Sequence, residues 1–489
     1  MVDAIGADMR AAGYTVDGVA DLLGRDADAA LSKGAVWPAV RATGNAAAED
    51  LRLAVLVRLF VLGCDEPAER VSASLPSVGV DALIANGVVE LTSQRQIRAV
   101  LDIRPHSDGV RDYLVVSDRD TSGREGPVRR DHVLGIGGAA LSLARAVVRT
   151  PVARALDLGV GSGVQSLHLA AHADAIVATD TNPRALALAA ATARLNGMSW
   201  DLRPGSLFEP VAGERFDLIV SNPPFVVGTG AHDYLYRDSG MAGDALCQSI
   251  VKQIPDHLQP GGTAQIMANW MVRTGQDWRE RVGGWLVGNG LDAWVVQREF
   301  ADPVTYVSLW LADAAETVER AVERGAQWLD WFEQEGIAGV GMGMICLRAG
   351  GGRTEPVLEE IAGAGEELTG MEVDAFFARR RYLCEHTDDD LLAARLSTAP
   401  VFLEQHSLPG SDGWEQVGAA VRRPGGPGAV IGVDEVFTAL LAGCRGEVPL
   451  RMLVDLLAAV HGVGPDALAD AALPVVREAI GRGILYEAQ

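Results

Sequence analysis

Between Ala153 and Leu347 the sequence alternates short apolar runs with longer amphipathic stretches, and this alternation limits the possible folds more than any other feature. The apolar runs predict buried strands and the stretches between them predict helices. A chain of this kind builds a parallel sheet with helices on both faces. Because residues 303–336 are mostly helical, the last strand is expected after them, although TYVSLWL within them is an alternative seventh strand. The predicted strands are 153–158, 175–180, 200–203, 216–221, 263–268, 293–298 and 339–347.

Two segments of different character flank this α/β core. Residues 1–132 begin with helical patterns, for which Thr15 and Asp26 are candidate N-caps, and end in a short β-ribbon. Residues 349–489 start within RAGGGRTEP, which predicts a linker, and close with three amphipathic helices and GRGILYEA. Both ends resemble a winged helix. We predict an N-terminal helical, winged-helix-like accessory domain over 1–132, the core over 133–348, and a mostly helical, winged-helix-like C-terminal accessory domain over 349–489.

The charge of the chain bears on its partners. The formal net charge is −23, each of the three predicted domains is net acidic, and the C-terminal one is the most acidic. Non-specific nucleic-acid binding depends on a positive surface, so the overall field of this protein opposes it. A narrow arginine patch, such as Arg379–Arg381, is the counter-argument. The charge therefore favours a protein partner over RNA or DNA.

Neither a membrane segment nor a metal site is predicted. The sequence has no apolar run of membrane-spanning length, and its start lacks the features of a signal peptide. The 5 cysteines are far apart and form no CxxC pair, which suits a reducing, cytoplasmic environment. His168, His172 and His257 lie on predicted helices without a third acidic ligand at zinc spacing. The oligomeric state cannot be predicted.

The stretch ALDLGVGSGVQSLHLA reads as strand, glycine loop and helix. Within it, Asp157, Gly159, Gly161 and Gly163 form the pattern D-x-G-x-G-x-G. Glycines at these positions let the backbone approach a ligand where a Cβ would collide. Nucleotide-binding sheets place such a loop at the carboxyl end of the first strand. All four residues are therefore candidate cofactor-binding residues.

The next strand ends in Asp180, a second candidate cofactor residue. A carboxylate there accepts hydrogen bonds from both hydroxyls of a ribose, as in NAD and S-adenosylmethionine sites. Its alternative role is that of N-cap for the following helix, which has a proline in its first turn. The short interval between the glycine loop and Asp180 is typical of methyltransferases. After the third strand, Leu207 and Phe208 are expected to flank an adenine ring, with Ser206 near its amino group.

SNPPF follows the apolar run FDLIV and ends the fourth strand. Pro223 and Pro224 have no N–H for a strand ladder, so they form a stiff loop that carries the amide of Asn222 and the ring of Phe225. Together with the glycine loop and Asp180, this chain resembles class I S-adenosylmethionine-dependent methyltransferases. SNPPF resembles the [ND]-P-P-[FYW] motif of those that methylate planar nitrogens. The resemblance covers about Val133–Leu347.

The resemblance implies a Rossmann-like, seven-stranded fold, S-adenosylmethionine as cofactor, and catalytic roles for the NPPF residues. The Asn222 side-chain oxygen and the Pro223 carbonyl would accept hydrogen bonds from the target nitrogen, with Pro224 keeping the loop rigid. Phe225 would stack on the planar target. Ser206 departs from the family, since many relatives carry Asp at that position.

Three functions remain open from the sequence. The first is methylation of a glutamine side chain in a protein such as a translation factor, which the acidic charge favours. The second is methylation of an amino group of an RNA or DNA base, which the aromatic ring of the motif and the winged-helix-like ends favour. The third is a non-catalytic binding protein, against which the set Asp157, Asp180 and Asn222 argues. Tyr234, Tyr236 and Arg237 are expected either to cover the target or to precede a helix that Asp244 caps.

Overall fold

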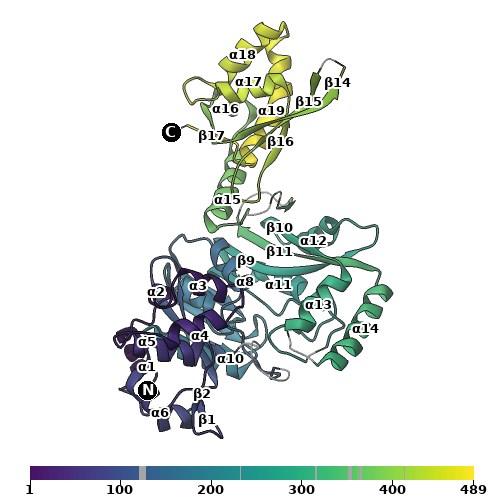
Figure 1. Ribbon diagram of the computed structural model, residues 1–489. Coiled ribbons are helices and arrows are strands. Elements are labelled where there is room, and N and C mark those ends of the chain that lie inside the picture. Colours follow the sequence, from purple (N-terminus) through teal and green to yellow (C-terminus); the bar gives the residue numbers. More distant parts are fainter. Residues whose placement is uncertain are drawn as a thin grey trace.

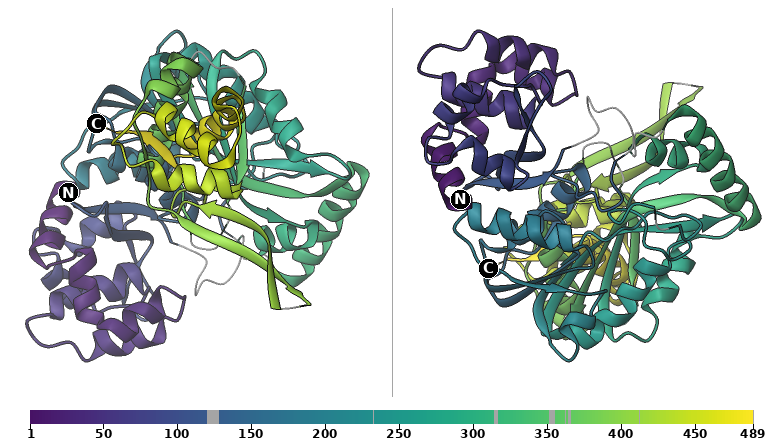
Figure 2. Two further views of the ribbon diagram at one scale, coloured as in Figure 1. Left: turned by 90° about the horizontal axis from the view of Figure 1, so that it is seen from above. Right: turned by 90° about the horizontal axis from the view of Figure 1, so that it is seen from below.

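The computed structural model describes residues 1–119, 128–231, 233–313, 317–350, 355–361, 363, 366–411 and 413–488. Part of the predicted linker, residues 351–354, lies outside the described residues. A central α/β body carries N-terminal helices on one side and a C-terminal domain that stands above it (Figure 1). Views from above and below show the same arrangement, with the C-terminal domain over the sheet and the N-terminal helices beside it (Figure 2).

The central body is built around one eight-stranded sheet. Its strand order is β12-β10-β11-β9-β8-β5-β6-β7. Only β11 among these described strands runs antiparallel to its neighbours. The strands are β5 (Val152–Leu158), β6 (Ala173–Asp180), β7 (Asp201–Pro204), β8 (Phe216–Ser221), β9 (Leu258–Arg273), β10 (Leu291–Ala301), β11 (Ile337–Ala349) and β12 (Val357–Glu360). The expected α/β, Rossmann-like core is confirmed, and its seven predicted strands are β5 to β11.

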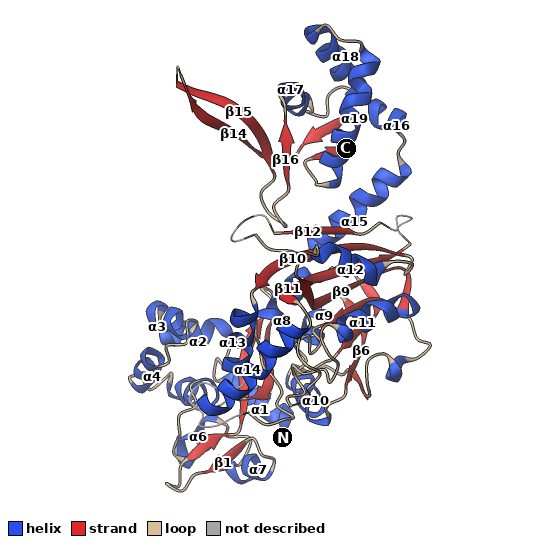
Figure 3. Ribbon diagram, turned by 90° about the vertical axis from the view of Figure 1, so that its right-hand side faces the viewer, coloured by secondary structure: helices blue, strands red, loops and turns tan. Residues whose placement is uncertain are grey.

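Two details differ from the sequence-based expectation. TYVSLWL, the alternative seventh strand, is helical and belongs to α13 (Pro303–Asp313). The segment after the predicted linker adds an eighth strand, since β12 pairs in parallel with β10 at the edge of the sheet nearest the C-terminal domain (Figure 3). The chain therefore completes its central sheet after leaving the predicted core.

Side-chain alternation along the strands creates a hydrophobic core on each face of the sheet. Ala155 and Val220 belong to one buried cluster, whereas Leu156 and Ile219 belong to the other. Successive strand residues point to opposite faces, so apolar residues at both alternations require helices on both sides. The remaining described elements of the body are α8 (Gly138–Ala146), α9 (Val164–Leu169), α10 (Pro183–Leu195), the 3₁₀ turn η2 (Glu209–Val211), α11 (Ala245–His257), α12 (Trp278–Leu286) and α14 (Val318–Gln334).

The N-terminal region is helical and ends in two β-hairpins. Thr15 caps α2 through a bond from the Gly18 N–H, as predicted, but Asp26 lies inside α3 and caps nothing, because Gly24 holds the N-cap position. The elements are α1 (Val2–Ala11), α2 (Val16–Leu23), α3 (Arg25–Leu31), α4 (Trp37–Gly44), α5 (Leu51–Leu56), the π-helical turn η1 (Val57–Val61), α6 (Ala68–Ser74), α7 (Val80–Ala85), β1 (Val89–Leu91), β2 (Ile97–Ala99), β3 (Leu101–Ser107) and β4 (Asp112–Asp118).

The hairpin β3–β4 joins this region to the central body. The N–H of Leu114 on β4 bonds the Asn196 side chain at the end of α10, and the Val116 N–H bonds the Thr192 hydroxyl. The order of helices followed by the short antiparallel pair β1–β2 is the one expected. Its nature as a winged helix stays a prediction, as do the domain boundaries.

The C-terminal domain is attached through α15. Its Phe376 ring stacks on Trp294 of β10 at 4.1 Å between centroids, and Arg380 forms a 2.6 Å ion pair with the buried Asp292. The three predicted terminal helices are α17 to α19. The elements are α15 (Gly370–Glu385), α16 (Asp388–Ala393), β13 (Leu396–Thr398), β14 (Phe402–Gly410), β15 (Gly413–Arg422), β16 (Val430–Val433), α17 (Glu435–Gly443), α18 (Leu450–His461), α19 (Pro465–Gly481) and β17 (Leu485–Glu487). Within the described chain, no helix has both the length and the apolarity needed to cross a bilayer.

Candidate active site

The three sequence motifs meet at the carboxyl ends of three adjacent strands of the sheet. Strand β5 lies between β6 and β8, and all three strands are parallel. The loop after Asp157, the Asp180 carboxylate and Asn222 follow the carboxyl ends of these adjacent strands, the usual place for a ligand in an open α/β sheet. The Ser221 hydroxyl also donates a 2.7 Å hydrogen bond to the Leu158 carbonyl, which ties the ends of β8 and β5 together.

The glycine loop has a backbone that needs glycine. Gly159, Gly161 and Gly163 have φ angles of 86°, 53° and 88°, in the left-handed region. A Cβ on Gly159 or Gly161 would meet no atom within 4 Å, so both face open space. At Gly163 a Cβ would lie 2.7 Å from the Trp200 ring, so this glycine allows helix α9 to pack closely. The first two glycines therefore leave a cradle for a ligand.

The Asp180 carboxylate is held by backbone N–H groups. It accepts hydrogen bonds from Gly161 at 3.0 Å and from Asn182 at 2.8 Å. Burial raises the pKa of Asp180 in spite of these bonds. Its alternative role as a helix cap is wrong, because the Asn182 side chain accepts the Arg184 N–H and caps α10.

The Asp157 carboxylate is fully buried beneath the loop. One oxygen accepts a 2.7 Å hydrogen bond from the Ser166 hydroxyl, and the other has no hydrogen-bond partner among the described residues. Burial raises the pKa of Asp157 to about 7. A buried carboxylate with a free oxygen suits a ligand that carries positive charge.

The SNPPF loop, residues 221–227, presents an unused acceptor. The Asn222 side-chain oxygen is buried and has no hydrogen-bond partner among the described residues. A buried acceptor left open is costly in a folded protein, so such a group points to a missing ligand. Phe225 is partly buried and meets the Trp310 ring edge-on, with 6.2 Å between centroids. The loop thus combines a hydrogen-bond acceptor with an aromatic ring.

The three residues predicted beside adenine lie in different environments. Ser206 is exposed, and Leu207 is partly exposed in a left-handed conformation with a φ of 48°. Phe208 is only 2% exposed and stacks on His257 at 4.4 Å, within the core beneath the sheet. The Phe208 ring therefore faces the core rather than an open adenine site.

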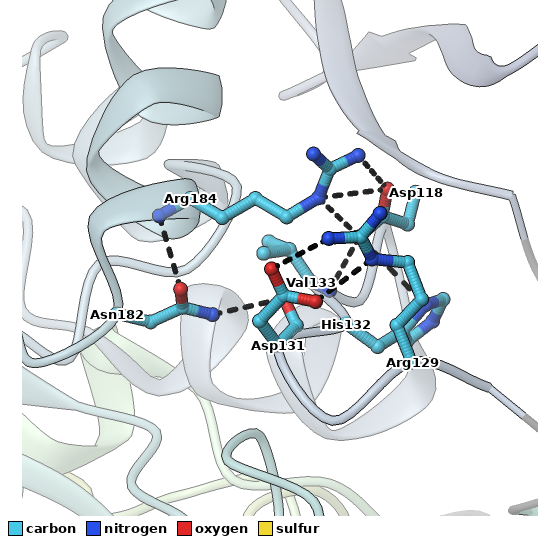
Figure 4. A network of polar contacts seen from close by, with 7 residues as sticks. All are labelled: Asp118, Arg129, Asp131, His132, Val133, Asn182 and Arg184. Carbon is cyan, nitrogen blue, oxygen red and sulfur yellow. Dashed lines mark hydrogen bonds and ion pairs between the residues drawn. The ribbon is translucent and has the colours of Figure 1, made fainter.

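A segment that sequence reasoning missed connects the strand ends. The Asn182 amide donates to the Asp131 carbonyl at 3.0 Å, and Arg184 pairs with Asp118 (Figure 4). On the other side of the segment, the Leu235 N–H donates to the Arg130 carbonyl at 3.0 Å. Residues 128–133 thus link the start of α10 to the chain that follows the SNPPF loop. No spacing in the sequence could have indicated these long-range bonds.

The residues after the SNPPF loop are packed rather than free. Arg237 is 1% exposed, and the Tyr236 hydroxyl bonds Asp313 at 2.6 Å. Asp244 holds the N-cap position of α11 without a capping bond, because its carboxylate pairs with Arg281 at 2.7 Å and accepts the Met271 N–H. Tyr236 and Arg237 are thus held within the body, and their expected role as a cover over the target stays a prediction.

Two of the histidines predicted on helices, His168 and His257, make hydrogen bonds within the central body. His168 hydrogen-bonds His106 at 2.8 Å between Nε2 atoms, and His257 bonds the Glu214 carbonyl. Burial lowers the pKa of His168 to about 4, so this pair is neutral near pH 7. No group of residues in the described parts of the chain could hold a metal ion.

Comparison with known proteins supports this reading of the central domain. The family model "Methyltransferase small domain" matches residues 137–285. Two models described as domains of unknown function, DUF7059 and DUF7782, match residues 11–100 and 374–487. The release factor glutamine methyltransferase of Geobacter sulfurreducens is 40% identical over 131 residues, which cover 24% of this chain and 46% of that protein.

Two further relatives match the same part of the chain. The release factor glutamine methyltransferase of Xylella fastidiosa is 36% identical over 129 residues, 24% of this chain and 47% of that protein. The ribosomal RNA small subunit methyltransferase C of Salmonella arizonae is 35% identical over 118 residues, 24% of this chain and 31% of that protein. The chain spans about half or less of the length of the curated relatives it matches.

The fold and the site define a class I S-adenosylmethionine-dependent methyltransferase domain. Its sequence is similar over this domain to release-factor glutamine methyltransferases and to small-subunit rRNA methyltransferases, and it carries the NPPF motif at residues 222–225. S-adenosylmethionine is the cofactor of this domain, and the open glycine cradle, with the buried Asp157 carboxylate and the partly buried Asp180 carboxylate, fits a cationic nucleoside.

Proposed function

We propose that this protein transfers a methyl group from S-adenosylmethionine to a planar amide or amino nitrogen of a macromolecule, first of all a glutamine side chain of a protein. The unpartnered, buried oxygen of Asn222 carries the proposal. This oxygen is a hydrogen-bond acceptor on a rigid loop beside an aromatic ring. A planar N–H₂ group could donate the hydrogen bond that it lacks among the described residues. A cytoplasmic location is part of the same proposal.

The cofactor, when bound, supplies an electrophilic methyl group on a sulfonium. An amide nitrogen is a weak nucleophile because its lone pair is delocalised over the carbonyl. The Asn222 oxygen and the Pro223 carbonyl accept its two N–H bonds and favour the pyramidal nitrogen of the transition state. Because Pro224 and the loop anchors keep these acceptors in place, little reorganisation is needed during reaction. Phe225 stacks on the plane of the target and sets its direction of approach.

The remaining assignments concern the cofactor. Gly159, Gly161 and Gly163 give the backbone room, and Asp180 binds the ribose hydroxyls. Asp157, which is buried beneath the glycine loop, stabilises the positive charge of the cofactor. This role fits a carboxylate whose pKa of about 7 leaves it easily ionised by a neighbouring cation.

For the adenine ring we assign Leu207 and Ser206, with Leu207 against the ring and Ser206 near its edge. Phe208 supports the loop from the core, as its burial and its contact with His257 indicate.

The choice of a protein acceptor rests on charge. The chain carries a net charge of −23, and phosphate backbones are bound through positive surfaces. The alternative, methylation of an RNA base, is favoured by the relative that is named as an rRNA methyltransferase and by the aromatic ring of Phe225. Both acceptors offer the planar nitrogen that the site suits.

Label transfer separates the two acceptors. The purified protein is incubated with an extract and tritiated S-adenosylmethionine, and the product is digested with nuclease or with protease. We expect label in material that is sensitive to protease and resistant to nuclease, and a glutamine residue that carries an N-methyl group by mass spectrometry. Label only in nuclease-sensitive material would select the RNA or DNA alternative. No transfer to either would leave the non-catalytic alternative.

A further inference from the structure

The SNPPF loop is fixed by hydrogen bonds near both of its ends. At its start, Ser221 bonds the carbonyl of Leu158, as described above. Pro223 and Pro224 have no N–H group, so these two residues cannot fix the loop with backbone donors. The position of Asn222 and Phe225 therefore depends on where the far end of the loop is fixed.

At the far end, the Val226 N–H donates to the Arg237 carbonyl at 3.3 Å, and both backbone polar groups of Val227 are held by side chains. Its N–H donates to the Tyr306 hydroxyl at 2.9 Å, and its carbonyl accepts a 3.1 Å hydrogen bond from the Trp328 indole. Val227 and Tyr306 are 0% exposed. The Asn269 amide of β9 donates to the same Tyr306 hydroxyl at 2.9 Å, so the hydroxyl is fixed to the sheet as well as to the loop.

The two side chains that bond Val227 come from helices that lie between β10 and β11 in the chain. Tyr306 is on α13 and Trp328 is on α14. Tyr306 also meets Trp310 edge-on at 6.2 Å, and Trp310 in turn meets Phe225. The helices thus reach the loop by two routes, one through the Val227 backbone and one through the motif's aromatic ring.

We propose that Tyr306 and Trp328 are positioning residues for catalysis, which set the location of the Asn222 and Pro223 acceptors by holding Val227. This inference rests on the proposed methyl transfer. Both groups act on the loop and lie outside the glycine cradle, so they affect the chemical step and leave the cofactor site alone. Burial raises the pKa of Tyr306 above its usual range, so its hydroxyl stays neutral and keeps accepting both N–H bonds.

Tyr306→Phe tests the hydroxyl while keeping the ring and its packing. Trp328→Phe removes the indole N–H and keeps an aromatic ring, although the side chain becomes smaller. Trp331→Phe is the matched control, since Trp331 lies on the same helix and packs on the same cluster but has no hydrogen bond to the loop among the described contacts. Amide hydrogen exchange at Val227 and label transfer to the acceptor identified above are measured for each protein.

For Tyr306→Phe we expect exchange at Val227 to be roughly 10-fold faster, because its N–H loses its acceptor. We expect kcat to fall by about the same factor, while KM for the acceptor and cofactor affinity by calorimetry change less than roughly twofold. Trp328→Phe should lower kcat in the same way. Trp331→Phe should match the wild type in kcat.

Unchanged exchange at Val227 in Tyr306→Phe would overturn the inference, as would a rise in KM with kcat intact or an equal loss in Trp331→Phe. If the wild type itself transfers no methyl group, the proposed function fails. In that case the exchange rates still decide whether Tyr306 holds the loop.

Discussion

The backbone N–H of Gly161 donates a 3.0 Å hydrogen bond to the carboxylate of Asp180, so the glycine loop and the end of the neighbouring strand form one unit. The loop conformation and the proposed ribose acceptor therefore depend on each other. With the ribose role proposed for Asp180, a change at this residue would remove a ligand contact and would also release the Gly161 N–H of the loop. We therefore expect cofactor affinity to be sensitive to substitution of Asp180.

Asp180→Ala should weaken S-adenosylmethionine binding by at least roughly 10- to 100-fold, since hydrogen bonds to a charged group are lost in both the ligand and the loop. Isothermal calorimetry with S-adenosylhomocysteine measures the change. Asp201→Ala, an exposed carboxylate on the adjacent strand β7, is the control and should bind normally. Equal affinity of Asp180→Ala and the wild type would remove Asp180 from the cofactor site.

Asn222→Ala should abolish methyl transfer and leave cofactor binding intact. A preorganised acceptor typically contributes about 10²- to 10³-fold in rate. Because the Asn222 oxygen has no partner in the unliganded protein, its removal should not lower Tm, unlike most substitutions of buried polar groups. Initial rates with labelled cofactor and a thermal melt test both points, with the exposed Asn86→Ala as control. Retention of more than about half the activity would exclude the catalytic role.

Asp157 should make the cofactor-free protein less stable as pH rises. Its carboxyl has a pKa of about 7 in the folded state and 3.8 as the reference value, so the folded state binds more protons between these values. Stability is lost as pH increases from about 4 to about 7, by up to roughly 4 kcal/mol, and is constant above that range. Asp157→Asn removes this titration.

Thermal melts at pH 5 and pH 8 measure the effect. The difference in Tm between Asp157→Asn and the wild type should be more positive at pH 8, where the wild-type carboxylate is ionised. Asp174→Asn, which removes an exposed carboxylate on β6, is the control for the loss of a charge. Saturating cofactor should reduce the effect for Asp157, because a cation compensates the buried charge. A pH-independent difference would contradict the raised pKa.

Arg184→Ala should destabilise the junction between the N-terminal hairpin and the central body. Arg184 donates to the Asp118 carboxylate, which is 7% exposed and also accepts the Val133 N–H at 2.9 Å. Leaving a buried carboxylate without its cation costs about 3–5 kcal/mol. Urea unfolding gives the change, and Arg129→Ala, an exposed partner of Asp131, should cost less than about 1 kcal/mol. Similar midpoints for both variants would show that the Asp118 pair is not needed.

Much of the fold follows from local sequence pattern, because buried parallel strands read as apolar runs and glycine loops need positive φ angles. β12 escaped prediction since VLEE is short, polar and adjacent to a glycine-rich stretch. TYVSLWL has β-branched and aromatic residues typical of a strand, yet Tyr306 and Trp310 lie one helical turn apart, and tertiary packing around Tyr306 holds the segment helical.

Some residues of the candidate site could also be predicted from the sequence, and others could not. Asp157, Asp180 and Asn222 could be selected because each directly follows or ends a predicted strand, so topology alone brings them together. Tyr306 and Trp328 could not, since their link to Val227 spans 79 and 101 residues and leaves no periodic signal. The burial of Phe208 could not be predicted, because the sequence does not show which way a side chain turns at a strand end, and its contact with adenine stays a prediction.

The parallel pairing of β12 with β10 has a practical consequence for dissecting this protein. A fragment that ends at residue 349 would leave β10 as a bare sheet edge, and the stacked Trp294 would lose Phe376. Open edges recruit other strands, so such a fragment would self-associate. Limited proteolysis before β12, within 349–356, should therefore release no monomeric central domain. The strand that precedes the C-terminal domain completes the central sheet, so the two parts cannot be separated without exposing a sheet edge.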